Sequence, residues 1–226
     1  MNTCFAKGVS PNDVIALDST ETKYVLAFNP LAEGPLGTSE HCERMTRVTL
    51  DAAKREGLPL SDFEATDPLG GAGAILSLVT KPGTYFYRSV GCGTSVDFAK
   101  VLRERTKFLA KLPKEEDSTL YGMLLFDALL ITAECAPQSE PHLIFVDEAY
   151  GFLASTVIDA LDRLTANRVG LVIAATYGQL AMLKLHQEQL YWALLERCGN
   201  VAAFGATDAT VQDIVLDVAR RLHRDD

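Results

Sequence analysis

The strongest constraint on the fold is a short apolar run that ends in two acidic residues, between Pro141 and Ala149. The run reads His-Leu-Ile-Phe-Val and is followed by Asp147 and Glu148. Such a run is typical of a strand buried on both faces of a parallel sheet. Carboxylates at the carboxyl end of that strand would lie at the crevice where open α/β sheets bind ligands. The run therefore predicts an α/β fold with a candidate site at Asp147 and Glu148, although some strands simply end in an acidic turn.

Length and composition fit a globular protein built as one α/β domain. The chain has 226 residues, of which 48% are hydrophobic and 23% charged. No apolar run is long enough to span a bilayer, and the first residues lack the basic start and apolar core of a signal peptide. The five cysteines lie far apart without a Cys-x-x-Cys pair, which argues against a zinc site or a disulfide framework. We therefore expect a cytoplasmic protein without a membrane span.

The charge pattern singles out one basic segment in an acidic protein. The formal net charge is −9, so the surface as a whole should not attract nucleic acid. The segment Lys100–Lys114 nevertheless carries six basic residues and one acid, and we expect most of it in a helix over residues 96–112. It is interpreted either as a solvated face, balanced by the acids of residues 115–117, or as a DNA-contacting surface or subunit contact.

Hydrophobic periodicity and turn signals predict alternating strands and helices in the second half of the chain, which implies a parallel sheet. The central strands are expected at Asp13–Asp18, His142–Asp147, Gly170–Ala175 and Val201–Phe204. Further strands are expected at residues 24–28, 74–79 and 84–90, and helices at residues 39–55, 96–112, 118–135, 155–165, 179–197 and 208–222.

The glycines of Leu69–Gly73 resemble a phosphate-binding loop at first sight. A P-loop, however, needs a Gly-Lys-Ser/Thr sequence, whose lysine and hydroxyl contact the phosphates and Mg²⁺. No such sequence occurs in the 226 residues. We therefore interpret these glycines as a turn before a strand.

Three stretches, in this order, resemble the motor domain of type IV secretion coupling proteins (TraG/TraD-like), within the FtsK/HerA group of hexameric DNA-pumping ATPases. The first is Asn12–Leu31, which includes Phe-Asn-Pro-Leu; the second is the Walker-B-like Leu143–Ala149; the third is Leu161–Leu180. The resemblance implies a three-layer RecA-like fold of the P-loop NTPase type, with a mostly parallel sheet and flanking helices. It implies one ATPase domain over residues 1–226, with residues 32–73 as a candidate small insertion or subdomain.

The resemblance also implies roles for individual residues. Asp147 would hold the Mg²⁺ of a bound Mg-ATP, and Glu148 would activate the attacking water. Arg168 matches the arginine finger that the family sends into a neighbouring site, with Arg163 as the alternative. The competing interpretation of Arg168 is a cation near a helix C-terminus. Gln179 lies near the family's sensor glutamine, although its spacing from the strand departs from the family's.

The sequence departs from the family at its front. The family's P-loop precedes the first of these strands, whereas only about a dozen residues precede Asp13 here. We therefore expect an N-terminally incomplete domain. It is interpreted as a non-hydrolysing relative, as a domain completed by the P-loop of another polypeptide, or as a fragment of a longer reading frame.

We expect an ATPase-like module of a conjugation or secretion machine that translocates DNA, working as a homo- or hetero-oligomer. It would hydrolyse ATP only if a P-loop is supplied to it. The alternative is a non-catalytic scaffold or adaptor that keeps the ATPase fold for protein–protein assembly. A third hypothesis is an enzyme acting on a small molecule, which a ligand pocket beside Asp18 and Asp147 would favour. No catalytic spacing supports it, since the four histidines are scattered along the sequence: His41, His142, His186 and His223.

Overall fold

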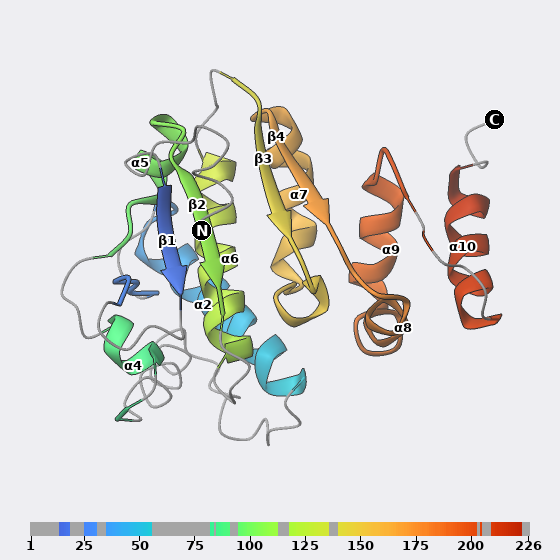
Figure 1. Cartoon of the computed structure of the whole chain (residues 1–226), viewed down its shortest axis with the longest axis horizontal. Coiled ribbons are helices and arrows are strands. Elements are labelled where there is room, and N and C mark those ends of the chain that lie inside the picture. The colour runs from blue at the N-terminus through green and yellow to red at the C-terminus, as the bar shows by residue number, and fades with distance from the viewer. Residues whose placement is uncertain are drawn as a thin grey trace.

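Figure 1 shows the chain as a row of parallel strands with helices behind and beside them. This computed structural model describes residues 14–18, 25–30, 35–55, 82–83, 85–90, 95–112, 118–135, 140–202, 204 and 209–222. None of the described helices is long and apolar enough to cross a membrane.

Strands and helices alternate in the middle of the described chain, over residues 107–186, and several helices follow one another on either side. In order, the elements are β1 (Val14–Asp18), α2 (Thr38–Arg55), α4 (Tyr85–Val90), α5 (Phe98–Arg103), β2 (Lys107–Lys111), α6 (Ser118–Cys135), β3 (His142–Val146), the 3₁₀ turn η3 (Ala149–Gly151), α7 (Thr156–Ala166), β4 (Val169–Ile173), α8 (Tyr177–His186), α9 (Glu188–Arg197) and α10 (Ala209–Leu222).

The described strands form two parallel pairs. β1 pairs with β2, so that Ala16 lies opposite Leu109. β3 pairs with β4, so that Phe145 lies opposite Val172. The strands lie side by side in the order β1, β2, β3, β4 (Figure 1), but β2 and β3 are not joined by ladder hydrogen bonds. The predicted α/β class and parallel pairing are therefore confirmed, as two short sheets within the described residues.

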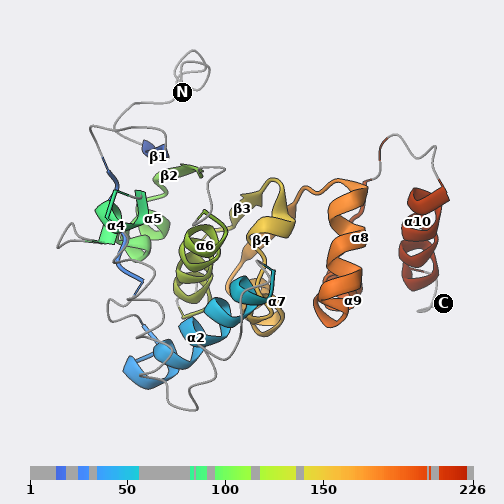
Figure 2. The same ribbon diagram turned by 90° about the horizontal axis from the view of Figure 1, so that it is seen from below.

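Helices cover one side of these strands. Figure 2 shows α2, α6 and α7 together on one side of the strands. Ile144 and Val146 of β3 are buried on that side, whereas Leu143 and Phe145 are 63% and 71% exposed. The expectation that both faces of this strand are buried is therefore wrong for the described chain. The three-layer RecA-like arrangement stays a prediction.

Helix α6 forms the centre of the core. Apolar side chains lie on all sides of it, and they take part in both hydrophobic clusters of the described chain. Tyr121 on one side makes edge-to-face contacts with Phe28, Tyr85 and Phe86. On the other side, Leu130 belongs to the cluster that α6 forms with β3, β4 and α7.

Gly122 lets α6 approach its neighbours closely. A Cβ at this position would lie 2.6 Å from a methyl carbon of Leu112 and would overlap the ring of Phe152. A larger residue would therefore force these packed side chains apart.

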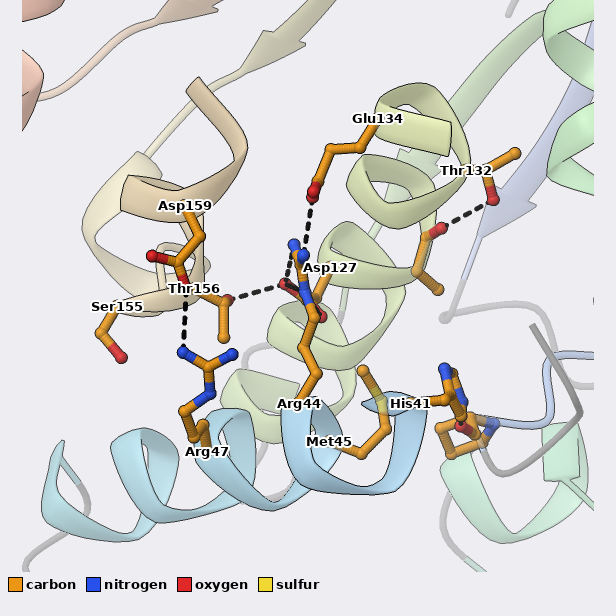
Figure 3. A network of polar contacts seen from close by, with 12 residues as sticks. His41, Arg44, Met45, Arg47, Asp127, Thr132, Glu134, Ser155, Thr156 and Asp159 are labelled. Atoms are coloured by element: carbon orange, nitrogen blue, oxygen red, sulfur yellow. Dashed lines mark hydrogen bonds and ion pairs between the residues drawn. The ribbon is translucent and has the colours of Figure 1, made fainter. Parts of the chain in front are cut away.

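A buried ionic network joins α2, α6 and α7 (Figure 3). Arg44 of α2 donates from Nε to Asp127 Oδ2 at 2.9 Å and from Nη2 to Asp127 Oδ1 at 3.0 Å. Its Nη1 lies 2.7 Å from Glu134 Oε1, on the same helix α6. The hydroxyl of Thr156, at the start of α7, donates to Asp127 at 2.7 Å. The network fixes α2 against α6 and α7, the helices that precede β3 and β4 in the chain.

Residues 85–90 form helix α4, so the strand expected at 84–90 is wrong in its described part. The aromatic run favoured a strand because aromatic residues are enriched there. In the structure, Tyr85 and Phe86 pack around Tyr121, and the Ser89 hydroxyl lies 3.1 Å from the Tyr121 hydroxyl. These contacts need the helical spacing of residues 85, 86 and 89, so packing outweighs local propensity.

The helix expected over residues 96–112 is correct only in part, because the segment holds a short helix and then a strand. Asp97 caps helix α5 by accepting from the N–H of Lys100, but the helix ends at Arg103. Arg105 then takes a left-handed conformation with φ of 56°, and the chain continues as β2. Pairing with β1 gives β2 its backbone partners, so the basic residues do not share one helical face.

Three further predictions need correction. The helix expected at 179–197 is broken into α8 and α9 at Gln187, whose φ of −143° is not helical. The described residues of the expected strand at Val201–Phe204 form no ladder with any described strand. Residues 25–28 likewise form no strand, and Phe28 instead donates its N–H to Ser89. Residues 69–79, with the expected glycine turn and strand, lie outside the described residues.

Candidate functional site

The candidate site lies at the carboxyl edge of the β3–β4 sheet. The register places Val146 opposite Ile173 at this edge. Beyond it, the N–H of Ala174 donates to Val146 O at 2.9 Å, and the N–H of Ala149 donates to Ala174 O at 3.2 Å. These bonds fix the segment that contains Asp147 and Glu148 against the turn that follows β4.

Both predicted acids are exposed at this edge. Asp147 Oδ1 accepts from the N–H of Glu148 at 2.9 Å. Glu148 itself is left-handed, with φ of 51°. This conformation costs about 1–2 kcal/mol in residues other than glycine. A strained acid directly after a parallel strand is an arrangement found at functional sites.

Gln179 lies at the same edge but has a structural contact. Thr176 ends the turn after β4 and caps α8, because its hydroxyl accepts from the N–H of Gln179 at 3.3 Å. In return, Gln179 Oε1 accepts from the N–H of Thr176 at 3.1 Å. This reciprocal capping box holds the start of α8. This bond fixes the position of the Gln179 side chain and leaves its oxygen one further lone pair for a water.

The acids alone do not make a metal centre. Among the described residues, no group of three or more His, Cys, Asp or Glu side chains is placed to hold a metal ion. Mg²⁺ prefers six oxygen ligands and usually takes only one or two of them from carboxylates. Asp147 alone fits that share, and the remaining ligands would come from phosphate oxygens and water.

Arg168 lies at the opposite edge of the same sheet. Its carbonyl accepts from the N–H of His142, the first residue of β3, at 3.0 Å. Five strand residues at about 3.3 Å each put roughly 16 Å between this edge and Asp147. Like Glu148, Arg168 is left-handed, with φ of 61°. Within one chain, Arg168 therefore cannot reach a phosphoryl group bound at Asp147.

Arg163, the alternative finger, has a structural partner. Its Nη1 lies 3.4 Å from Glu134 Oε2, so α7 adds a second cation to the buried network of α2 and α6. Burial raises the pKa of the Glu134 carboxyl, and the charges of Arg44 and Arg163 oppose this rise.

The described histidines are not gathered into a catalytic group. His41 Nε2 lies 2.8 Å from the carbonyl of Pro30. His142 contacts the carbonyls of Glu140 and Leu102 through its two ring nitrogens. His186 lines a cavity at the end of α8, and His223 lies outside the described residues.

That cavity has a volume of about 390 Å³ and lies between the end of α2, the η3 turn and the α8–α9 link. Arg55 holds its walls by donating to the carbonyls of Tyr150 and Leu153 and, at 2.8 Å, to Gln187 Oε1. Neither Asp18 nor Asp147 lines it. It therefore gives no support to a small-molecule site beside these acids.

The sequence did not predict that one side of both sheets is exposed. Large apolar side chains are exposed on that side: Leu109 on β2, Leu143 and Phe145 on β3, and Val172 on β4. The only sequence signal for an exposed face was the apolar run itself, and it is ambiguous. An apolar run is equally compatible with a covered face and with a face that another molecule covers.

Comparison of the chain with protein-family models, with curated proteins and with solved structures gives no match. No family is shown. The resemblance to coupling proteins therefore rests on the three sequence stretches alone.

Proposed function

We propose that this chain is an ATPase-like module of the type found in coupling proteins, and that it acts on Mg-ATP together with a phosphate-binding loop from outside these 226 residues. The observation that carries the proposal is the placement of Asp147 and Glu148 at the carboxyl edge of two parallel strands. Their turn is hydrogen-bonded to Ala174, so they lie next to the segment that leads into α8. Such an edge is where open α/β sheets bind ligands.

The roles of the acids follow from their chemistry. Asp147 would contribute one oxygen to Mg²⁺, and its bond from the N–H of Glu148 orients the carboxylate. Glu148 would accept a proton from the attacking water. RecA-like topology, DNA translocation and assembly into an oligomer of the secretion machinery belong to this proposal.

The test is a titration of the labelled protein with Mg-ADP, followed by backbone amide NMR. Phosphate contacts from a P-loop are not available, so we expect weak binding that depends on Mg²⁺. The largest shifts are expected at residues 147–149 and 174–179. Asp147→Ala should abolish them, whereas Asp213→Ala, which removes an exposed acid on α10, should not.

Two results would contradict the proposal. One is the absence of any Mg²⁺-dependent shift at millimolar nucleotide. The other is an equal response in Asp147→Ala, which would place nucleotide binding elsewhere. Calorimetry on the same variants gives the affinity independently of the assignment.

One observation favours the second candidate function, a non-catalytic scaffold. At this edge, two predicted site residues make structural hydrogen bonds to nearby backbone. Gln179 accepts from Thr176 in the cap of α8, and Asp147 accepts from the N–H of Glu148. A scaffold predicts that Asp147→Asn and Glu148→Gln leave stability and assembly nearly unchanged. If either conservative change abolished the function of the protein, a non-catalytic scaffold would be excluded.

A further inference from the structure

We propose that Lys111 is a phosphate-binding residue of the candidate site and contacts the β-phosphate of a nucleotide bound beside Asp147. The inference rests on the proposed function, because it adds a residue to the same nucleotide site. A P-loop would supply a lysine to such a phosphate, but no Gly-Lys-Ser/Thr sequence occurs in the 226 residues. Of the four described strands, only β2 ends in a cation, and that cation is Lys111.

β2 and β3 lie next to each other at both of their ends, although no ladder joins them. At the start of β3, His142 Nε2 lies 2.8 Å from the carbonyl of Leu102, in the helix that leads into β2. At the other end, a Cβ on Gly122 would lie 2.6 Å from Leu112 Cδ1 and 2.4 Å from Phe152 Cδ1. Leu112 directly follows β2 and Phe152 follows the η3 turn, so the two segments meet over α6. The carboxyl ends of β2 and β3 therefore share one edge (Figure 1).

Lys111 and Asp147 also lie on the same side of these strands. On β2, Phe108 packs edge-to-face on Phe98 in the core, with ring centroids 5.4 Å apart. Because side chains alternate along a strand, Lys111 lies on the opposite side, where it is exposed. On β3, Val146 is buried, and the next residue, Asp147, is exposed. The lysine and the acid therefore lie on the exposed side of neighbouring strand ends.

Three carboxylates at this edge make an added positive charge favourable for phosphate binding. Asp18 ends β1, and Asp147 and Glu148 follow β3, so their charges repel an anionic nucleotide. In phosphoryl-transfer sites a lysine at the phosphates offsets such repulsion, as a point charge on a flexible stem. Lys111 Nζ lies 3.7 Å from Asp18 Oδ1, and the two side chains are 66% and 38% exposed. This pair is therefore weak, and Lys111 is able to turn to a phosphate.

Two arginines near the β3–β4 sheet are less suited to this role. Arg55 donates to the carbonyls of Tyr150 and Leu153 in the wall of the cavity, so its guanidinium is already committed. Arg168 lies at the amino edge of the sheet, roughly 16 Å from Asp147. The lysine at the end of β2 is therefore the best placed of these three cations.

A titration of the labelled full chain with Mg-ADP, followed by backbone amide NMR, tests the proposal. In the native protein, we expect shifts at residues 110–112 in addition to those at 147–149. Lys111→Met should weaken Mg-ADP binding by about tenfold, since it removes a charge-assisted hydrogen bond to the phosphate. Lys111→Arg keeps the charge and should retain most of the affinity.

Lys107→Met is the matched control for the loss of one positive charge. Lys107 lies on the same strand and the same side, but at the amino edge, roughly 13 Å from Lys111. It should bind Mg-ADP as the native protein does, and urea denaturation checks that each variant folds. Equal weakening in the two methionine variants would show a general effect of net charge and would overturn the proposal.

Asp18→Asn separates a direct contact from an effect through the ion pair. If Lys111 acted only by neutralising Asp18, the double variant Asp18→Asn/Lys111→Met would bind as tightly as Asp18→Asn alone. A direct contact with the phosphate instead predicts that the double variant binds about tenfold more weakly than Asp18→Asn. Equal affinities of these two variants would overturn the proposal.

The same titration distinguishes failure of this inference from failure of the proposed function. If the native chain binds, Asp147→Ala abolishes binding and Lys111→Met binds as tightly as the native chain, only the role of Lys111 is overturned. If the native chain shows no Mg²⁺-dependent shift, the nucleotide site itself is absent, and both proposals are overturned.

Discussion

Arg44 carries the largest stability effect that we expect from one side chain. Burial disfavours its charge, but Asp127 and Glu134 outweigh burial and raise the pKa of Arg44. Arg44→Met would leave both carboxylates buried without this partner. Breaking a buried ion pair from one side costs about 3–5 kcal/mol. We expect a loss of this size in the free energy of unfolding, measured by urea denaturation.

Arg47 supplies the control on the same helix. Its Nη1 lies 2.9 Å from Asp159, but both side chains are about half exposed. Arg47→Met should therefore change the free energy of unfolding by less than about 1 kcal/mol. Equal losses in Arg44→Met and Arg47→Met would show that the network does not hold α2 in place.

Glu134 should give the network a pH dependence of its own. Burial raises the pKa of this carboxyl above its ordinary value of about 4.5. Between the two values, the folded state binds more protons than the unfolded state, so rising pH lowers the free energy of unfolding. Glu134→Gln lacks this titration. The difference in unfolding free energy, variant minus native protein, should therefore grow as pH rises above about 4.5. Urea denaturation over a pH series measures it, and a constant difference would contradict the raised pKa.

Among the elements, β3, α7 and β4 were predictable from the sequence, whereas α4, β2 and the break between α8 and α9 were not. β3, β4 and α7 are specified by apolar runs and periodicity within themselves. Helix α4 depends on contacts with Tyr121, and β2 depends on pairing with β1, both far away in the sequence. The break between α8 and α9 at Gln187 has no glycine or proline to mark it. Local patterns do not contain these contacts.

The exposed side of β3 makes a sharp prediction about two adjacent residues. Ile144 is packed in the core, so Ile144→Ala should cost about 2–5 kcal/mol. Phe145 is exposed on the other face of β3, so Phe145→Ala should stay within about 0.5 kcal/mol of the native protein. Thermal and urea denaturation measure both. A large loss in Phe145→Ala would mean that this face of β3 is covered in the protein in solution.

Over the full chain, the sequence predicted which residues lie at strand ends but not which ends share an edge. Asp147 and Gln179 follow β3 and β4, and parallel pairing brings both to the carboxyl edge. Arg168 precedes β4 and lies at the other edge, beside His142. Only the pairing and register of the two strands separate these residues, and neither is visible in a motif. The roles predicted for Asp147, Glu148, Arg168 and Gln179 stay predictions.

This separation decides what Arg168 can do. At roughly 16 Å from Asp147, it cannot touch the same phosphoryl group in one chain, since the β3–β4 sheet lies between them. We therefore expect Arg168→Ala to leave the Mg-ADP shifts of the isolated chain unchanged, whereas Asp147→Ala abolishes them. In an assembly with a supplied phosphate loop, Arg168→Ala should instead lower hydrolysis by about 10³-fold at unchanged nucleotide affinity, as for an arginine finger. If Arg168→Ala abolished the shifts of the isolated chain, Arg168 would act on its own site, and the strand register would be wrong.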